Sequence, residues 1–523
     1  MSTFKVAIAS LKMALATFLS RIMGLVREQL MAHFFGASGL TDAFLVAYRI
    51  PNLLRDLLAE GAFSSAFVPT FVKENQKDHE KGRELLWELF ILLGSLTAIL
   101  SLLIALFADP LIRIFAPSFV LDPEKFSITV SLTRIMSPFL FFISIAALFM
   151  GALNSLRVFF IPSLAPAFYN LMSIFSMLFL TGWLMDSGYQ PILALGWGAC
   201  LGGFMQAIVQ IPMLIKKGYQ PKKILKLGSE PAKKVIKLLG PGMVGFAATQ
   251  INLLINTILA TGSVVGATSW LNYSFRLFQL PVGILSVSIG NSNLVHFSSA
   301  WKDGKKQEAI SFLSSSLFLS YVTVLPAMGI LFFLSEELVG IVYQRGKFDY
   351  HSTQMTATAL RMYAIGLPLY SLYKIWVPTF YALDKQRIPV VSSLISIGIN
   401  ILFSVLTVDE YGFSMLALGT TLSMFINCLI QAWYLKKYLD LKWSFFINWR
   451  LIKLLLATVS LSLTLHYLSA FYFEVHASVW HRFALATGFV FIGVLSFVFS
   501  LVVLKERALV DLVMERVKSR KKR

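Results

Sequence analysis

The chain contains few charged residues and few cysteines for its length. Charged residues make up 14% of its 523 residues, against about 25% in an average soluble domain. Its only cysteines, Cys200 and Cys428, lie in apolar segments with no pairing pattern, which predicts buried thiols and gives no information about redox compartment. The histidines lack metal-ligand spacing, and no P-loop, H-E-x-x-H or G-x-S-x-G motif occurs. We therefore expect neither a metal nor a cofactor, and no soluble domain that hydrolyses a nucleotide.

Apolar residues are abundant instead, and they recur in long runs. Hydrophobic residues make up 57% of the chain, and the runs reach the roughly 20 residues that a membrane-spanning helix requires. The polar stretches between them are short. The sequence thus predicts an all-α polytopic membrane protein rather than soluble domains. The first apolar run contains Arg21 and Arg27 and lacks a cleavage pattern, so we expect it to be retained rather than removed as a signal peptide.

About fourteen spans are predicted. Their approximate ranges are 10–34, 42–72, 86–115, 128–153, 161–184, 190–215, 235–261, 266–298, 310–334, 355–383, 389–408, 412–435, 450–472 and 483–504. Lys and Arg collect in every second connection and in the C-terminal tail, which predicts cytoplasmic termini. The net charge of +19 follows this pattern, and the chain has no soluble basic face interleaved with aromatics, so nucleic acid is not an expected partner.

The two halves of the chain carry similar motifs in the same order. Thr41 precedes Arg49 by eight residues, and Thr268 precedes Arg276 in the same way. Further on, SPFLFFISIAALFMGALNSLR resembles LPLYSLYKIWVPTFYALDKQR, which aligns Pro138 with Pro368. Two parallel six-helix repeats are therefore predicted, a transporter architecture with its cargo site between the halves. The expected division is a first half (1–217), a basic cytoplasmic linker (218–234), a second half (235–440), and two extra C-terminal helices with a basic tail (441–523).

Arginines interrupt the first two predicted spans. A charge at the centre of a bilayer costs roughly 2.5–3.5 kcal/mol on insertion scales, so these residues indicate a polar cavity. Residues three, four or seven apart share a helix face, which groups them into two stripes. In the first span Arg21 and Glu28 share a face, and Arg27 is adjacent to it. In the second span the stripe contains Asn52, Arg55, Asp56 and Glu60, with Arg49 seven residues before Asp56. Because guanidinium matches phosphate oxygens, the excess of arginine predicts an anionic phosphate or pyrophosphate cargo.

Other interpretations of these charges remain open. The arginines and their acids could be purely structural pairs, and Asp42 could only cap a helix N-terminus. Arg134 and Arg361 lie near span ends, where we expect them to reach toward the interface. Lys374 lies deep in the span at 355–383, and we favour a cavity position for it. Pro281 and Gly283 suit a helix that bends or unwinds.

These residues resemble a known family. The stretches SRIMGLVRE, TDAFLVAYRIPNLLRDLLAEGAFSSAFVP, NYSFRLFQLPVGIL and VYQRGKF are similar to the MurJ lipid II flippases, of the multidrug/oligosaccharidyl-lipid/polysaccharide exporter superfamily. The resemblance runs over nearly the whole chain. It implies that substrate is bound by residues at the positions of the family's essential arginines, its second-span acid and its tenth-span lysine. These are Arg21, Arg27, Arg55, Arg276, Asp42 and Lys374, with Glu28, Arg49, Asn52, Asp56 and Glu60 as supporting charges of the cavity.

The chain departs from the family pattern at three positions. Glu28 stands where many members have Asp, Phe275 precedes Arg276 where a polar residue is frequent, and Asn256 replaces an acid used by some relatives for sodium. No sodium site is therefore expected.

The resemblance implies a non-enzymatic, monomeric lipid transporter of the bacterial cytoplasmic membrane. It implies that lipid II is flipped from the inner to the outer leaflet, driven by the membrane potential or an ion gradient. Cell-wall synthesis or division proteins are candidate partners. The alternatives are a flippase for another polyprenyl-pyrophosphate oligosaccharide, a multidrug exporter, an intramembrane transferase acting on the same carrier lipid, and a cell-division scaffold.

Overall fold

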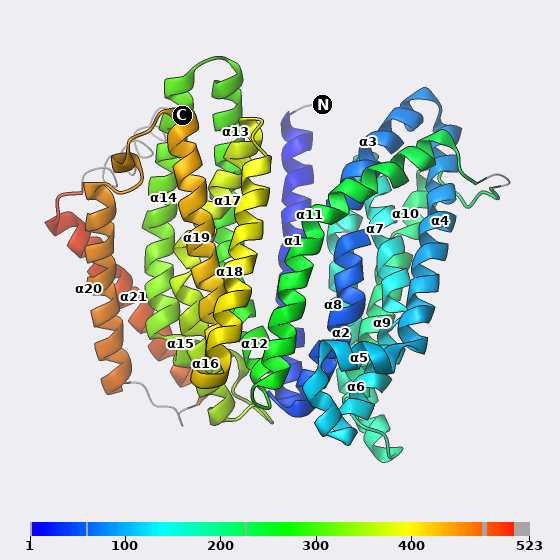
Figure 1. Cartoon of the computed structure of the whole chain (residues 1–523), viewed down its shortest axis with the longest axis horizontal. Helices are drawn as coiled ribbons and strands as arrows, with labels where there is room; N and C mark the ends of the chain where they lie inside the picture. Colours follow the sequence, from blue (N-terminus) through cyan, green and yellow to red (C-terminus); the bar gives the residue numbers. More distant parts are fainter. Residues whose placement is uncertain (1–2, 59–60, 225–226, 473–477, 507–523) are drawn as a thin grey trace. The chain divides into compact units, whose positions relative to one another are not determined.

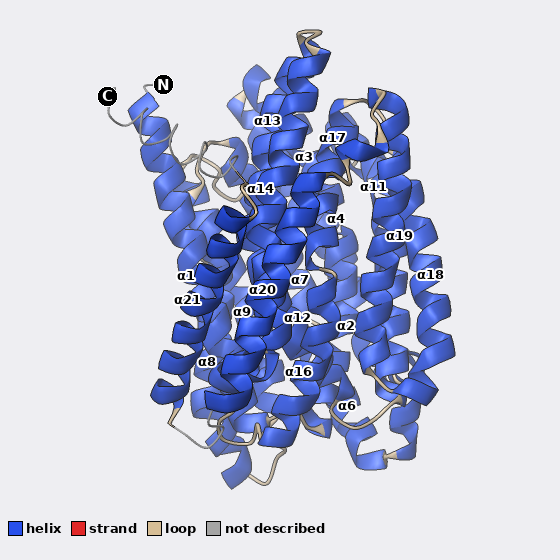
Figure 2. Cartoon of the chain, turned by 90° about the vertical axis from the view of Figure 1, so that its left-hand side faces the viewer, coloured by secondary structure: helices blue, strands red, loops and turns tan. Residues whose placement is uncertain are grey.

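The structure is a computed structural model that describes residues 3–58, 61–224, 227–472 and 478–506. All regular secondary structure within these ranges is helical (Figures 1 and 2). The first eleven α-helices are α1 (Thr3–Phe35), α2 (Gly39–Leu58), α3 (Gly61–Lys77), α4 (His79–Leu106), α5 (Ala108–Phe115), α6 (Pro123–Met136), α7 (Phe139–Ser155), α8 (Phe160–Asp186), α9 (Leu193–Ile208), α10 (Ile211–Lys216) and α11 (Glu230–Gly262).

Ten further α-helices and three short helical segments complete the described chain. The helices are α12 (Ala267–Pro281), α13 (Val287–Lys302), α14 (Lys306–Phe333), α15 (Ser335–Tyr343), α16 (Tyr350–Ile365), α17 (Leu367–Ala382), α18 (Arg387–Tyr411), α19 (Ser414–Leu439), α20 (Trp449–Tyr472) and α21 (Val479–Val503). The short segments are η1 (Pro117–Leu121), η2 (Val282–Ser286) and η3 (Trp443–Phe445).

Helices cover every predicted span, so the all-α membrane class is confirmed. Nine helical segments of the described chain are long and apolar enough to cross a membrane. Three of the predicted spans outside these nine lie on α2–α3, α12–α13 and α16–α17, which carry Arg55, Arg276 and Lys374 respectively. The spans with the candidate site residues are thus among the more polar ones, as expected for helices that line a polar interior.

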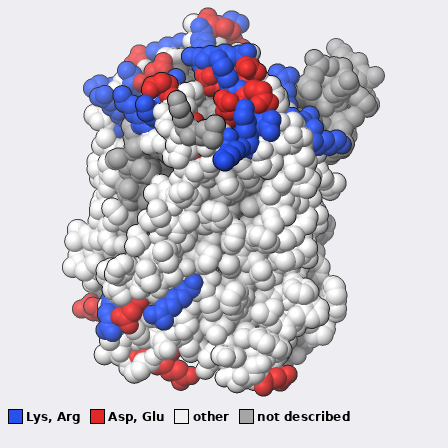
Figure 3. All heavy atoms as spheres, turned by 90° about the vertical axis from the view of Figure 1, so that its right-hand side faces the viewer, with Lys and Arg blue, Asp and Glu red and all other residues white. Residues whose placement is uncertain are grey.

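The charges are distributed as a membrane protein requires. On the face shown in Figure 3, Lys, Arg, Asp and Glu gather at the two ends and leave a wide uncharged band between them. Elsewhere in the chain, Arg83 of α4 pairs with Glu80, and Lys222 pairs with Glu80 and Glu84. An uncharged band of this kind matches the hydrocarbon core of a bilayer.

The helices form two compact units. Unit 1 comprises residues 1–269 together with 345–348, and unit 2 comprises 270–344 and 349–523. Helix α11 belongs to unit 1, although it is the first helix of the predicted second half. The predicted repeat boundaries remain a prediction, because compactness and repeat ancestry are different properties of a chain.

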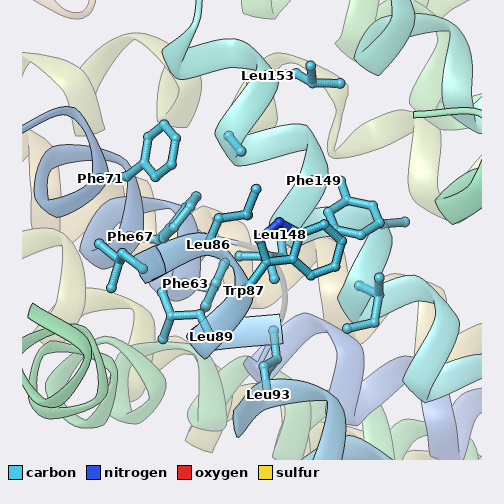
Figure 4. Close-up of a cluster of buried hydrophobic side chains, with 14 of the residues drawn as sticks. Phe63, Phe67, Phe71, Leu86, Trp87, Leu89, Leu93, Leu148, Phe149 and Leu153 are labelled. Atoms are coloured by element: carbon cyan, nitrogen blue, oxygen red, sulfur yellow. The ribbon is translucent and has the colours of Figure 1, made fainter. Parts of the chain in front are cut away.

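The core of unit 1 is built around α3, α4 and α7 (Figure 4). Phe63, Phe67 and Phe71 lie four residues apart on α3, so they form one aromatic stripe. This stripe packs in one cluster with Trp87 of α4 and Phe149 of α7. A second cluster joins α2 with α5 and α6. The two clusters fix the helices that surround α2, which carries half of the predicted site.

Unit 2 contains two cores as well. One joins α13, α14, α17 and α19 around Trp376 and Phe380. The other joins α14 with α20 and α21 around Leu461 and Phe497, so the two extra C-terminal helices pack directly on the unit.

Prolines mark breaks within several spans. Pro138 separates α6 from α7, and its predicted repeat counterpart Pro368 lies in the first turn of α17, just after α16 ends. A π-helical segment follows Pro281 and occupies Val282–Ser286. Proline removes a backbone donor, and π-segments are commonly found at functional sites. The helix is therefore irregular at the position where the sequence suggested that it bends or unwinds.

Candidate functional site

Arg27 lies where α1 packs against α8. Its Nη2 donates to Glu28 Oε1 at 2.6 Å, and its guanidinium carbon lies 5.2 Å from the ring centre of Tyr169 on α8. The two helices come close because Asn170 Nδ2 donates to the carbonyl oxygen of Ser20 at 3.0 Å. The arginine side chain is 18% exposed. Arg27 is therefore held between an acid of its own helix and an aromatic face of the next.

Arg55 forms a similar pair on α2. Its Nε and Nη2 both donate to Asp56 Oδ1, at 3.1 and 2.7 Å. The second oxygen of Asp56 accepts from Gln250 Nε2 on α11 at 3.2 Å. Asp56 therefore orients Arg55 and also ties α2 to α11.

Two tyrosines bring these arginines into one neighbourhood. Phe139 packs against the rings of Tyr48 and Tyr169, at 5.6 and 5.8 Å between ring centres. Arg27 lies near both tyrosines, and Arg55 lies near Tyr169. Unit 1 thus gathers Arg27, Arg55 and two phenol groups, all of which can hydrogen bond with phosphate oxygens. We call these four residues the arginine–tyrosine cluster.

Asp42 has a different environment. Its side chain is buried and accepts hydrogen bonds from the backbone nitrogens of Gly266 and Ser269, at 2.7 and 2.9 Å, and from Ser269 Oγ at 2.6 Å. Lys125 Nζ lies 3.7 Å from its Oδ2. Since α12 begins at Ala267, Asp42 supplies an N-terminal cap to α12 rather than to its own helix.

The other predicted residues of the first two spans lie in various environments. The side chain of Arg21 on α1 is exposed, and those of Arg49 and Asn52 on α2 are half-buried. Glu60 lies outside the described residues.

Unit 2 holds the remaining predicted site residues. Arg276 is an exposed residue of α12. The ring centre of the neighbouring Phe275 lies 5.3 Å from that of Tyr363. Lys374 is an exposed residue of α17. At this position α13 crosses so closely that a Cβ on Gly290 would lie 2.3 Å from the carbonyl oxygen of Lys374. The backbone that carries Lys374 is therefore fixed by direct contact with a neighbouring helix.

The residues near span ends behave differently from each other. Arg134 is exposed, as expected for a residue at an interface. Arg361 instead donates from Nε to Ser335 Oγ at 2.8 Å and lies 3.8 Å from Glu336, so it joins α15 to α16. Among the described residues, no cluster of three or more His, Cys, Asp or Glu side chains is arranged to hold a metal ion.

Sequence reasoning did not identify Tyr48, Tyr169 or Gln250. Tyr169 and Gln250 lie in helices that carry no predicted site residue, and the roles of all three residues depend on contacts between helices. The one available signal was the position of Tyr48 directly before Arg49.

The fold of the chain matches the folds of solved membrane proteins. It superposes on a solved structure described as an inward-facing MATE family multidrug transporter of the MOP superfamily with a TM-score of 0.67, at 10% identity, covering 82% of this chain and 96% of that one. A structure described as lipid II flippase MurJ in an inward closed conformation gives a TM-score of 0.77, at 24% identity, covering 95% of this chain and 99% of the other. The molecule therefore has the exporter fold that the MurJ and MATE transporters share.

Sequence comparison defines the family. The family model for lipid II flippase MurJ matches residues 31–480. The chain is 35% identical to the lipid II flippase MurJ of Burkholderia cenocepacia, over 80% of each chain. It is 33% identical to the probable lipid II flippase MurJ of Buchnera aphidicola subsp. Acyrthosiphon pisum, over 88% of this chain and 90% of the relative. The chain belongs to the MurJ family of lipid II flippases, and is thus a transporter rather than an enzyme.

Proposed function

We propose that the protein flips lipid II from the inner to the outer leaflet of the bacterial cytoplasmic membrane by alternating access. Family membership supports this function. The observation that carries the site assignment is the arginine–tyrosine cluster, in which Arg27 and Arg55 share one neighbourhood inside unit 1. In our proposal this cluster binds the pyrophosphate of the substrate.

The acids that pair with the arginines of the cluster have a positioning role in this mechanism. Glu28 and Asp56 each hold the guanidinium of the preceding residue, at 2.6 and 2.7 Å. An arginine that is already oriented loses less side-chain entropy when a phosphate binds, so affinity for the substrate increases. Arg21 and Arg49 add positive charge to the same two helices, and the proposed site keeps an excess of positive charge over Glu28 and Asp56.

Arg276 and Lys374, which lie in unit 2, are proposed as further substrate-binding residues. Asp42, by contrast, is proposed to act on substrate only indirectly, since its carboxylate oxygens cap α12. The proposed repeat is supported by the same contact. Asp42 and Ser269 are 227 residues apart, which is also the offset between Arg49 and Arg276.

We propose that the membrane potential supplies the driving force. Moving one charge across 100 mV is worth about 2.3 kcal/mol, so a cargo with about two negative charges leaving a negative interior would gain roughly twice that. Flipping in proteoliposomes should accelerate when a potential of the physiological sign is imposed. An unchanged rate after the potential is collapsed, with ion gradients held constant, would contradict this mechanism.

The proposal also includes cytoplasmic termini, a monomeric state and recruitment by cell-wall synthesis or division proteins. Accessibility labelling of each terminus tests the orientation.

The functional test is depletion of the native flippase and complementation by variants, with lipid II measured at the outer leaflet. Arg27→Ala and Arg276→Ala should abolish exposure of lipid II while the proteins remain in the membrane. Arg113→Ala is a matched control, because Arg113 is an exposed residue of α5 that pairs with Asp109. Exposure at the wild-type level in both cavity variants would refute the site assignment, and would leave scaffolding as the better explanation.

A further inference from the structure

A buried arginine lies in α21, outside the predicted repeat. Arg482 is in the first turn of α21 and is 5% exposed. Its Nη1 donates to Oε1 of Gln344 at 2.9 Å. Gln344 follows α15 directly, so the guanidinium of Arg482 holds the end of that helix. A buried charge that donates a hydrogen bond of this kind requires a structural or functional reason.

The local structure makes room for this guanidinium. A Cβ on Gly340 would lie 3.1 Å from Gln344 Oε1 and 3.3 Å from Arg482 Nη1, closer than a side chain normally approaches. Gly340 therefore leaves the space in which the two side chains meet.

The other C-terminal helix holds α15 as well. Ser469 of α20 donates from its hydroxyl to Oε1 of Glu337, whose side chain is buried. The burial of Glu337 would be costly without such a donor. Thus α20 and α21 contact α15 at two separate positions along its length.

The residues directly after Gln344 attach to α1. Residues 345–348 group with unit 1, and the backbone nitrogen of Lys347 donates to the carbonyl oxygen of His33 at 2.9 Å. Two glycines with positive φ, Gly36 and Gly346, allow the two backbones to approach closely there. A Cβ on Gly346 would lie 2.4 Å from the carbonyl oxygen of His33, and a Cβ on Gly36 would lie 2.4 Å from that of Lys347. The loop therefore fits the end of α1, the helix that carries Arg27.

We propose that Arg482 is a positioning residue that sets the loop 345–348 against the end of α1. The C-terminal helix pair is then a mechanical support for α15 and for the loop, in addition to any surface it offers to lipid. A change at α21 would reach the arginine-bearing helix through Gln344 and four residues of continuous chain. The consequence for flipping rests on the proposed function, whereas the position of the loop does not.

Hydrogen–deuterium exchange of the full-length protein in detergent tests this coupling. The amide of Lys347 should exchange about tenfold faster in Arg482→Gln than in the wild type, because a hydrogen bond to a charged group is lost next to the loop. His481→Gln is the matched control, since His481 is the adjacent exposed residue of α21. Exchange at the wild-type rate in folded Arg482→Gln would overturn the proposal.

Two further variants keep the test decisive if Arg482→Gln is unstable. Gln344→Leu removes the acceptor and should accelerate exchange of the same amide. Gln344→Glu keeps an acceptor for Arg482 and should restore protection. Equal exchange in these two variants would also contradict the proposal.

Flipping assays separate this inference from the proposed function. Arg27→Ala should stop translocation without changing exchange in the loop. Arg482→Gln should accelerate exchange in the loop whatever the cargo is, and should slow translocation without weakening binding of lipid II. Changed loop exchange with normal translocation would support the positioning of the loop by Arg482 and refute its consequence for flipping.

Discussion

Substitutions in the pair Arg27–Glu28 can distinguish an arginine that binds substrate from one that only stabilises the fold. Arg27 and Glu28 are 18% and 7% exposed, so breaking the pair by removing only the arginine should destabilise the protein by up to roughly 3 kcal/mol. Loss of transport in Arg27→Ala would therefore be ambiguous. Replacing both residues, as Arg27→Gln with Glu28→Gln, removes the two charges together and should leave stability within about 1 kcal/mol of the wild type.

The double variant should be stable but inactive. Each charge-assisted hydrogen bond lost from a pyrophosphate is worth roughly 1.5–3 kcal/mol, which corresponds to about a ten- to hundredfold loss of affinity. Thermal unfolding in detergent measures the stability, and translocation of fluorescent lipid II in proteoliposomes measures the activity. The single variant Glu28→Gln leaves Arg27 charged but less firmly held, so its activity should fall less than that of the double variant.

The result that would refute this reasoning is a stable double variant that translocates lipid II at the wild-type rate. Arg27 would then serve only to neutralise Glu28, and the structural interpretation of the arginine–tyrosine cluster would be correct.

Three other substitutions probe the framework of the site. Asp42→Ala should lower the stability of the protein by about 1–2 kcal/mol, because the cap on α12 is lost, whereas Asp42→Asn should lower it less. Equal unfolding temperatures for the two variants would contradict the capping role. Gln250→Leu removes the donor to Asp56 and should cost about 1–3 kcal/mol, with transport impaired because α2 and α11 separate. Gly290→Ala should destabilise the protein strongly, since the added Cβ would lie 2.3 Å from a carbonyl oxygen of α17. Gly398→Ala, whose added Cβ would have nothing within 4 Å, should be neutral or stabilising by up to about 1 kcal/mol. Similar unfolding temperatures for the two glycine variants would refute the close helix crossing.

The sequence predicted the helices well because hydrophobic runs are a local property. Each predicted span coincides with helix, and Pro138, Pro281 and Pro368 each lie at a break or an irregular turn, since proline acts on the turn that contains it. The arginines were recognised because a charge within an apolar run requires no knowledge of its neighbours.

The partners of those arginines could not be predicted in the same way. Helical periodicity grouped Arg21 with Glu28 and Arg49 with Asp56, whereas the structure shows Glu28 bound to the adjacent Arg27. Long side chains can turn around the helix, so residues that are neighbours in sequence can also pair. Tyr169 contributes from α8, about 140 residues away along the chain from Arg27. Such contacts depend on how helices pack, which no local pattern encodes.

The hydrogen bond between Asp42 and Ser269 joins equivalent positions of the proposed repeat. In a symmetric pair of identical half-length chains, this contact would bring together two copies of one side chain. Two carboxylates would repel each other there, because like charges at close range are unfavourable in a buried position. If the proposed repeat arose by duplication, one position could become the acceptor and the other the donor only after the two copies had diverged in sequence. The cap on α12 would then be a contact that duplication alone could not create.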